Sequence, residues 1–239
     1  MNTSDPIRAG SNASNDDKRT TIILPVWHVE PWQKYLTAAV VNILRATTRI
    51  PFELVIAETQ HHDAEELADR YLHFPDPISL VKKLNETLQT VTTEWVVGIG
   101  NDVFVRPGWL EALHACFTTY PDCGYACLGG SELKHAVEAK IVEGFYHAVT
   151  MMRRGWFYDE DFESWFGDAD LLLRVYQHGQ RAYRNHAVVV DHLGSATYRT
   201  LYSNDKKEEI YNRGLELLKK KHGNSPLLVY RALVNGMIL

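Results

Sequence analysis

Short apolar segments alternate with amphipathic segments in the first half of the chain, and this alternation constrains the fold most strongly. Residues 21–26, 53–57 and 94–99 are rich in Val, Ile and Leu, without regular polar alternation. Such runs are typical of strands that are buried on both faces of a parallel sheet. Segments with apolar residues at helical spacing or with helix-start signals lie at 32–47, 63–72, 80–91 and 109–119. The sequence therefore predicts an α/β fold with a mostly parallel central sheet flanked by helices, doubly wound with right-handed crossovers.

The chain of 239 residues is long enough for one large domain with a small appendage. Residues 1–19 are rich in Ser, Asn and Asp with almost no apolar anchor, so we expect a disordered N-terminal tail. We assign residues 20–223 to the α/β domain and 224–239 to a C-terminal helical extension. The apolar stretch of this extension could pack on the domain, form a homodimer contact or touch a membrane surface. We expect it to pack on the domain.

The amino-acid composition limits the binding partners and the cellular compartment that we expect. A net charge of −5 argues against non-specific binding to nucleic acid, and the Lys-rich segment 206–221 contains interleaved Glu residues that indicate a solvated helix face. The three cysteines, an odd number, favour reduced thiols. There is no signal peptide and no apolar run of the ~20 residues that a transmembrane segment needs. We therefore expect a cytoplasmic protein, with any membrane-linked acceptor met from the periphery of the bilayer.

Polar or aromatic groups follow the carboxyl end of each expected strand. These segments are 26–28 (Val-Trp-His), 58–60 (Glu-Thr-Gln) and 100–102 (Gly-Asn-Asp). In doubly wound sheets, ligands bind in the crevice beyond the carboxyl ends of the strands. The three segments are therefore candidates for a ligand site.

Asp102 stands at the tip of an apolar strand, where an ordinary surface charge is unexpected. Mg²⁺ or Mn²⁺ that bridges phosphates needs only one or two carboxylates, because phosphate oxygens and waters complete its shell. An Asp that caps the turn leading to Pro107 explains the residue equally well. His192 follows a buried strand at 187–190, and its imidazole suits Mn²⁺, although a lone His is more often structural.

Asp168 and Asp170 open a helix that runs to about His178 and ends at Gly179. Acids in a first helical turn are explained in part by capping and by the helix dipole. One of them follows a Trp-Phe-Gly turn that exposes it in a cleft, where it would act as a general base toward an acceptor hydroxyl. Trp156 and Trp165 are candidate stacking surfaces for a sugar ring, although Trp is as often part of the core.

These segments, taken in this order, resemble family 2 glycosyltransferases of the GT-A fold. The resemblance covers about residues 20–223, nearly all of the expected domain. The matching positions are the opening strand 22–26, Glu58 at the end of the second strand, Asn85, Asn101-Asp102 with 107–110, Asp168 to Leu171 with Arg174 and Gly179, the turn 192–195, and 221–223.

The resemblance implies an inverting transfer of a sugar from a nucleotide-sugar donor to an acceptor hydroxyl, with Mn²⁺ or Mg²⁺ as cofactor. Asp102 and His192 would bind the metal, and Asp168 would be the general base, with Asp170 and the two tryptophans as acceptor or sugar candidates. The residues assigned to the nucleotide are Pro25, Val26, Trp27, Glu58, Lys82, Asn85 and Asn101. The acceptor class stays open among a glycan, a lipid-linked glycan, a protein and a nucleic-acid base.

The sequence departs from the family at two positions. Glu58 replaces the Asp that usually contacts the nucleotide, and the usual D-x-D motif is Gly100-Asn101-Asp102, which keeps only the last acid. Two alternatives follow. The thinned motif suits a catalytically silent nucleotide-sugar-binding protein, while a nucleotidyltransferase on a related sheet is disfavoured because residues 25–31 contain no glycine-rich phosphate loop.

Overall fold

The computed structural model describes residues 20–131, 141–163, 165–194 and 200–223. The expected tail at 1–19, Ser195 and the expected extension at 224–239 lie outside the described residues. The strands are β1 (Thr20–Trp27), β2 (Phe52–Thr59), β3 (Arg70–Phe74), β4 (Trp95–Ile99), β5 (Val103–Phe104), β6 (Cys123–Gly130), β7 (Ile141–Glu143), β8 (Val149–Arg153) and β9 (Arg181–His192). The helices are α1 (Gln33–Thr47), η2 (Glu65–Leu67), α2 (Leu80–Gln89), α3 (Trp109–Thr119), α4 (Gly167–Gln177) and α6 (Asn204–His222).

One half of the sheet is parallel and the other half is mixed. The strand order is β3-β2-β1-β4-β8-β6-β9-β5, with β7 paired to β9. β3, β2, β1 and β4 are parallel, and β1 pairs with β2 over its whole length, from Thr20 opposite Phe52 to Trp27 opposite Thr59. β8 is antiparallel to both β4 and β6, whereas β6 and β9 are parallel. The predicted α/β sheet is confirmed.

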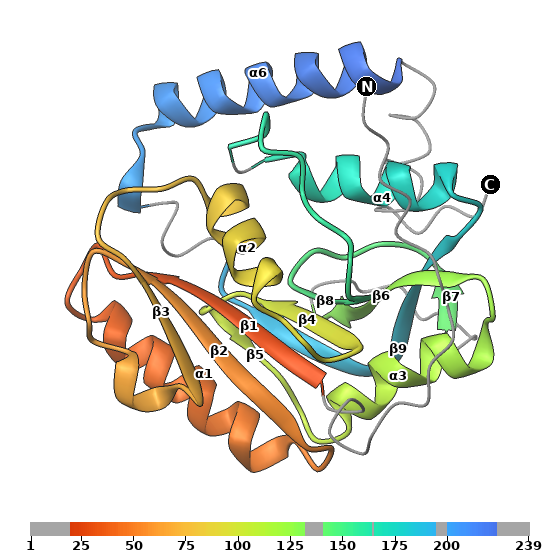
Figure 1. The fold of residues 1–239 in the computed structure, drawn as a ribbon, viewed down its shortest axis with the longest axis horizontal. Helices are drawn as coiled ribbons and strands as arrows, with labels where there is room; N and C mark the ends of the chain where they lie inside the picture. Colours follow the sequence, from red (N-terminus) through yellow and green to blue (C-terminus); the bar gives the residue numbers. More distant parts are fainter. Residues whose placement is uncertain (1–19, 132–140, 164, 195–199, 224–239) are drawn as a thin grey trace.

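Helices cover both faces of the sheet (Figure 1). α1 and α3 pack on one face, where Val40, Leu44 and Leu113 join the strand residues of the largest apolar cluster. α2 and α4 cover the opposite face through residues such as Leu88 and Leu172. β1, β2 and β4 are thus covered on both sides, which explains the apolar runs at their centres.

The segment after β2 is where the sequence interpretation is wrong. The helix expected at 63–72 is instead the short turn η2 followed by the parallel strand β3. Asp69, near the start of β3, ties it to β2, because its carboxylate accepts a hydrogen bond from the Leu54 amide (2.8 Å) and its own amide donates to the Leu54 carbonyl (3.0 Å). These contacts lie between segments distant in sequence, so tertiary pairing overrides the local helical pattern.

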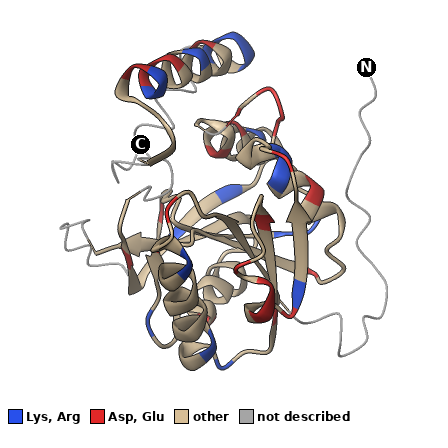
Figure 2. Cartoon of the chain, turned by 90° about the vertical axis from the view of Figure 1, so that its left-hand side faces the viewer, with Lys and Arg blue, Asp and Glu red and all other residues tan. Residues whose placement is uncertain are grey.

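α6 forms an outer layer over α2 and α4, where Leu218 packs with Val81 and Leu173. Gly214 allows a close approach, because a Cβ there would lie 3.0 Å from the Phe166 ring and 3.1 Å from the Trp165 carbonyl oxygen. Acidic and basic side chains alternate along α6 (Figure 2), as expected for a solvated face. Within the described ranges, no helix has the length and apolar character that crossing a membrane requires.

Candidate active site

The carboxyl ends of β1, β2 and β4 meet at one edge of the sheet, because the three strands are parallel neighbours. The loop after β4 carries Asn101 and Asp102, both buried. β8 begins at the same edge, since it runs antiparallel to β4 with Val149 opposite Ile99. Residues far apart in sequence therefore gather at this edge, as sheets of this kind require.

Asp102 and His192 are adjacent. β5 pairs with β9 so that Val103 lies opposite His192, and the Leu193 amide donates to the Asp102 carbonyl (3.0 Å). This pairing brings His192 Nε2 within 3.4 Å of Asp102 Oδ1. Both side chains are mostly enclosed, with 12% and 7% of their surface exposed. A carboxylate oxygen and an imidazole nitrogen thus converge from two strands.

His147 extends this pair. It precedes β8, whose position is fixed in part by a hydrogen bond from the Gly100 amide to the Ala148 carbonyl (3.4 Å). The His147 and His192 rings make an edge contact, with their centroids 5.4 Å apart. His147 is exposed, so it lies at the solvent side of the pair.

Asp168 lies in the first turn of α4 and is half-buried. Burial raises the pKa of its carboxyl group above the ordinary value, while the charge of His147 and the backbone amides of Ala169 and Asp168 oppose that rise. His147 and Asp168 interact electrostatically. Phe166, two residues before Asp168, has a φ of 69°, a conformation that is rare outside glycine and recurs at functional sites. The structure therefore brings Asp102 and His192 together, and a position of Asp168 beside them stays a prediction.

The β1 and β2 ends are joined by side chains. Trp27 Nε1 donates to Gln60 Oε1 (2.9 Å), and Gln60 itself has a φ of 70°. Lys83 of α2 reaches between the strands, where its Nζ donates to the Val26 carbonyl and to the Thr59 hydroxyl, both at 2.9 Å. Burial lowers the pKa of Lys83 to about 7, against the opposing effect of the Glu58 carboxylate.

Glu58 is fully enclosed. Its Oε2 accepts hydrogen bonds from the Ala64 amide (3.0 Å) and the Tyr71 hydroxyl (2.9 Å), and its Oε1 faces His28. Burial alone would raise the pKa of Glu58, but these contacts together hold it below the ordinary value. The expected nucleotide contact of Glu58 stays a prediction.

Two residues of α2 that were assigned to the nucleotide have other surroundings. Lys82 is exposed and lies 3.9 Å from Glu86, one turn further along the helix. Asn85 binds the backbone of Tyr158 at both polar atoms, because its Nδ2 donates to the carbonyl and its Oδ1 accepts from the amide, each at 2.8 Å. Asn85 thus holds the segment that precedes α4.

The remaining candidates lie around α4. Trp156 contacts His178 at the end of this helix, about 15 Å along the helix axis from Asp168 at 1.5 Å per residue, and is not brought to the site. Trp165 packs edge-on against Tyr211 of α6. Asp170 is buried; its Oδ2 accepts from Arg174 Nε (2.8 Å), and its Oδ1 lies 2.8 Å from His222 Nε2.

Sequence reasoning missed Lys83 and His147. A signal for Lys83 was present, because Lys82 and Glu86 have the i,i+4 spacing of a solvated ion pair, which turns the next lysine toward the sheet. His147 gave no such signal, since only the antiparallel placement of β8 brings it to this edge.

A parallel half-sheet continued by a mixed half, with polar side chains gathered where the parallel strands end, is the arrangement of the GT-A glycosyltransferases, and this chain has that fold. No family model matches the sequence, and no curated protein sequence matches it significantly.

Solved structures do match. The mannosyltransferase PcManGT from Pyrobaculum calidifontis, in complex with GDP-Man and Mn²⁺, superposes with a TM-score of 0.65 and 15% identity, covering 92% of this chain and 69% of that one. S. aureus TarS 1–349 gives a TM-score of 0.57 and 11% identity over 85% of this chain and 72% of that one. A longer TarS structure gives a TM-score of 0.56 and 12% identity, and the match covers 84% of this chain and 43% of that one.

Proposed function

We propose that this protein is an inverting glycosyltransferase that transfers a sugar from a nucleotide-diphosphate donor to an acceptor hydroxyl. The observation that supports this proposal is the adjacency of Asp102 and His192 at the carboxyl edge of a GT-A sheet, with His147 against His192. Asp168 interacts electrostatically with His147, which supports its assignment to the same site.

The donor set at Asp102 and His192 fits Mn²⁺ or Mg²⁺. The 3.4 Å between Oδ1 and Nε2 is about 0.4 Å longer than the separation of about 3.0 Å between neighbouring ligands in an octahedral shell with bonds of about 2.1 Å, so a small rotation of either side chain would bring both atoms into such a shell. Two protein ligands leave the other positions to phosphate oxygens and waters. When bound, such a cation neutralises the negative charge that develops on the leaving nucleotide.

Asp168 would accept the proton of the acceptor hydroxyl. Its raised pKa suits this task, because a base is most effective when its pKa approaches the working pH. With one base and direct attack on the anomeric carbon, the configuration inverts, and the proton remains on the Asp168 carboxyl group until release. The charge of His147 partly opposes this rise in pKa and so favours the ionised carboxylate.

The β1 and β2 ends are the proposed nucleoside side of the site. Trp27 and Gln60 present an aromatic ring and an amide, and Asn101 lies next to the metal-binding position. The complex of PcManGT with GDP-Man and Mn²⁺ makes GDP-mannose a rational first donor to test. The acceptor hydroxyl would belong to a glycan, a lipid-linked glycan, a protein or a nucleic-acid base.

The first experiment identifies a donor and then removes the base. UDP-, GDP-, dTDP- and CDP-sugars with Mn²⁺ are screened for a rise in melting temperature, since binding to the native state stabilises it. With the donor that binds, Asp168→Asn should lower nucleotide release about 10²- to 10⁴-fold and leave donor affinity unchanged. Asp205→Asn, an exposed acid at the start of α6, is the matched control.

The outcomes are distinct. Near-normal turnover by Asp168→Asn would remove Asp168 as the base. Donor binding without nucleotide release by the unmodified protein, across a panel of acceptors, would favour the catalytically silent alternative.

A further inference from the structure

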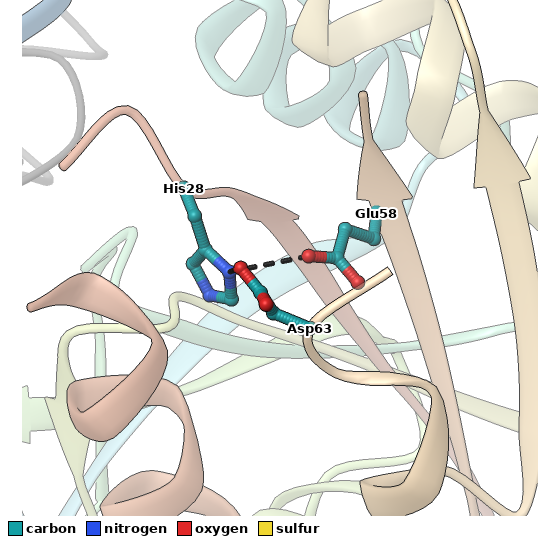
Figure 3. Close-up of side chains that lie close together, drawn as sticks. All are labelled: His28, Glu58 and Asp63. Atoms are coloured by element: carbon teal, nitrogen blue, oxygen red, sulfur yellow. Dashed lines mark ion pairs between the residues drawn. The ribbon is translucent and has the colours of Figure 1, made fainter. Parts of the chain in front are cut away.

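A second group of metal-ligating side chains lies apart from Asp102 and His192. His28, Glu58 and Asp63 direct one ligand atom each into a common space, and these atoms lie within 4.8 Å of one another (Figure 3). Nδ1 of His28 is 3.1 Å from Oε1 of Glu58 and 3.6 Å from Oδ2 of Asp63. The residues come from the segment after β1, the end of β2 and the segment that precedes η2.

The other ring nitrogen of His28 is already engaged. Nε2 lies 2.9 Å from the Thr37 hydroxyl oxygen, which also accepts from Asn101 Nδ2 at 3.5 Å. When Nε2 carries the proton of the neutral ring, it donates to Thr37. In the neutral ring, Nδ1 then presents its lone pair toward Glu58. A second hydrogen bond of this kind commonly orients histidines that ligate metals.

Glu58 is oriented in the same manner. The hydrogen bonds from Ala64 and Tyr71 both reach Oε2, which leaves Oε1 directed at His28. Among the described residues, neither Glu58 Oε1 nor His28 Nδ1 has a hydrogen-bond partner of acceptable geometry, although both atoms are buried. The side chains are 0% and 3% exposed. A buried carboxylate oxygen and an imidazole nitrogen this close need a positive charge between them, which a metal ion or a proton supplies.

Asp63 supplies the third ligand and the opening to solvent, because its side chain is 42% exposed. A tetrahedral Zn²⁺ site with bonds of about 2.0–2.1 Å places neighbouring ligand atoms about 3.3 Å apart. The distances of 3.1 and 3.6 Å from Nδ1 bracket that value. Imidazole nitrogen and carboxylate oxygen are both ligands that Zn²⁺ accepts, and three protein ligands leave a fourth position for water.

We propose that His28, Glu58 and Asp63 form a binding site for a divalent transition-metal ion, Zn²⁺ by its geometry and donors. The ion would join the β1 end, the β2 end and the segment before η2 around one point. Through Thr37 it would also be linked to Asn101, the neighbour of Asp102. The proposal does not depend on sugar transfer.

The experiment measures metal binding rather than activity. The full chain is stripped with a chelator and titrated with Zn²⁺ by calorimetry, and bound metal is counted by elemental analysis after dialysis. Asp63→Asn, a change at a solvent-facing ligand that the fold tolerates, should weaken the tight Zn²⁺ equivalent at least about tenfold. Glu66→Gln, a nearby exposed acid, is the matched control. Asp102→Asn should keep the tight equivalent, which separates this site from the proposed donor site.

Co²⁺ gives a second readout. Tetrahedral Co²⁺ in the stripped protein should show intense visible bands that Asp63→Asn loses and Asp102→Asn retains. Unchanged Zn²⁺ affinity in Asp63→Asn would overturn the proposal. So would a protein that binds no Zn²⁺ and whose ¹⁵N spectrum shows both His28 nitrogens protonated, since a proton would then be the cation between the two side chains.

Discussion

Lys83 offers a quantitative test of how deeply the ends of β1 and β2 bury a titratable group. Its side chain is 3% exposed, and its amino group donates to the Val26 carbonyl and the Thr59 hydroxyl. Burial lowers its pKa from 10.5 to about 7. Lys83→Met keeps a long apolar side chain but removes the titratable group.

The magnitude follows from linkage. The unfolded lysine binds its proton more tightly than the folded one, so unfolding takes up protons and stability rises with pH between the two pKa values. For pKa values of about 7 and 10.5, the gain between about pH 7 and about pH 9 is roughly 2 kcal/mol. Lys83→Met should lack this gain. The loss of hydrogen bonds to two buried acceptors adds a separate, pH-independent decrease of about 1–3 kcal/mol in the free energy of unfolding.

The assay is urea unfolding of both proteins at several pH values in this window, with the difference in unfolding free energy plotted against pH. Lys82→Met, the exposed neighbour on the same helix, controls for the loss of a lysine and should follow the unmodified protein. A difference that does not vary with pH for Lys83→Met would refute the reasoning, because it would mean that Lys83 keeps an ordinary pKa in the folded protein.

Three further outcomes are expected. The acidic limb of the kcat/KM–pH profile should lie at a higher pH than the ordinary pKa of an aspartate, because Asp168 acts only when ionised. His147→Asn should move this limb to still higher pH, because it removes a charge that lowers the pKa of Asp168. A limb that does not move would show that His147 has no effect on the pKa of Asp168. EDTA should stop nucleotide release and added Mn²⁺ should restore it, since Asp102 and His192 alone cannot neutralise the leaving diphosphate; full activity in EDTA would contradict this. Asn85→Ala should lower the free energy of unfolding by about 1–3 kcal/mol, measured in urea against Glu86→Gln, because two backbone groups of Tyr158 lose their partner; equal stability of the two variants would contradict this.

The parallel half of the fold was predictable because burial on both faces leaves a direct trace in the sequence. β1, β2 and β4 contain uninterrupted apolar runs, and α3 begins and ends where the helical pattern does. β6 leaves a weaker trace, since its sequence is rich in glycine and cysteine. β3 was not predictable, because it forms through contacts to β2 that a local pattern does not contain.

Candidate residues could be selected where a single polar residue marks the end of a strand or the start of a helix. Asp102, Asp168 and His192 occupy such positions, the ordered resemblance to a family selected them, and their roles stay predictions. In α2, the i,i+4 spacing of Lys82 and Glu86 indicates the solvated face, which leaves Lys83 for the sheet. His147 depends on an antiparallel strand whose neighbour is set by the whole sheet, so no local feature indicates it.

The close contact between Gly214 and the Phe166 turn has a consequence for biosynthesis. The Phe166 turn leaves the ribosome before α6 does, because α6 follows it in the chain. Asp168, the proposed base, is therefore present in the nascent chain before Gly214 can pack against the turn that precedes it.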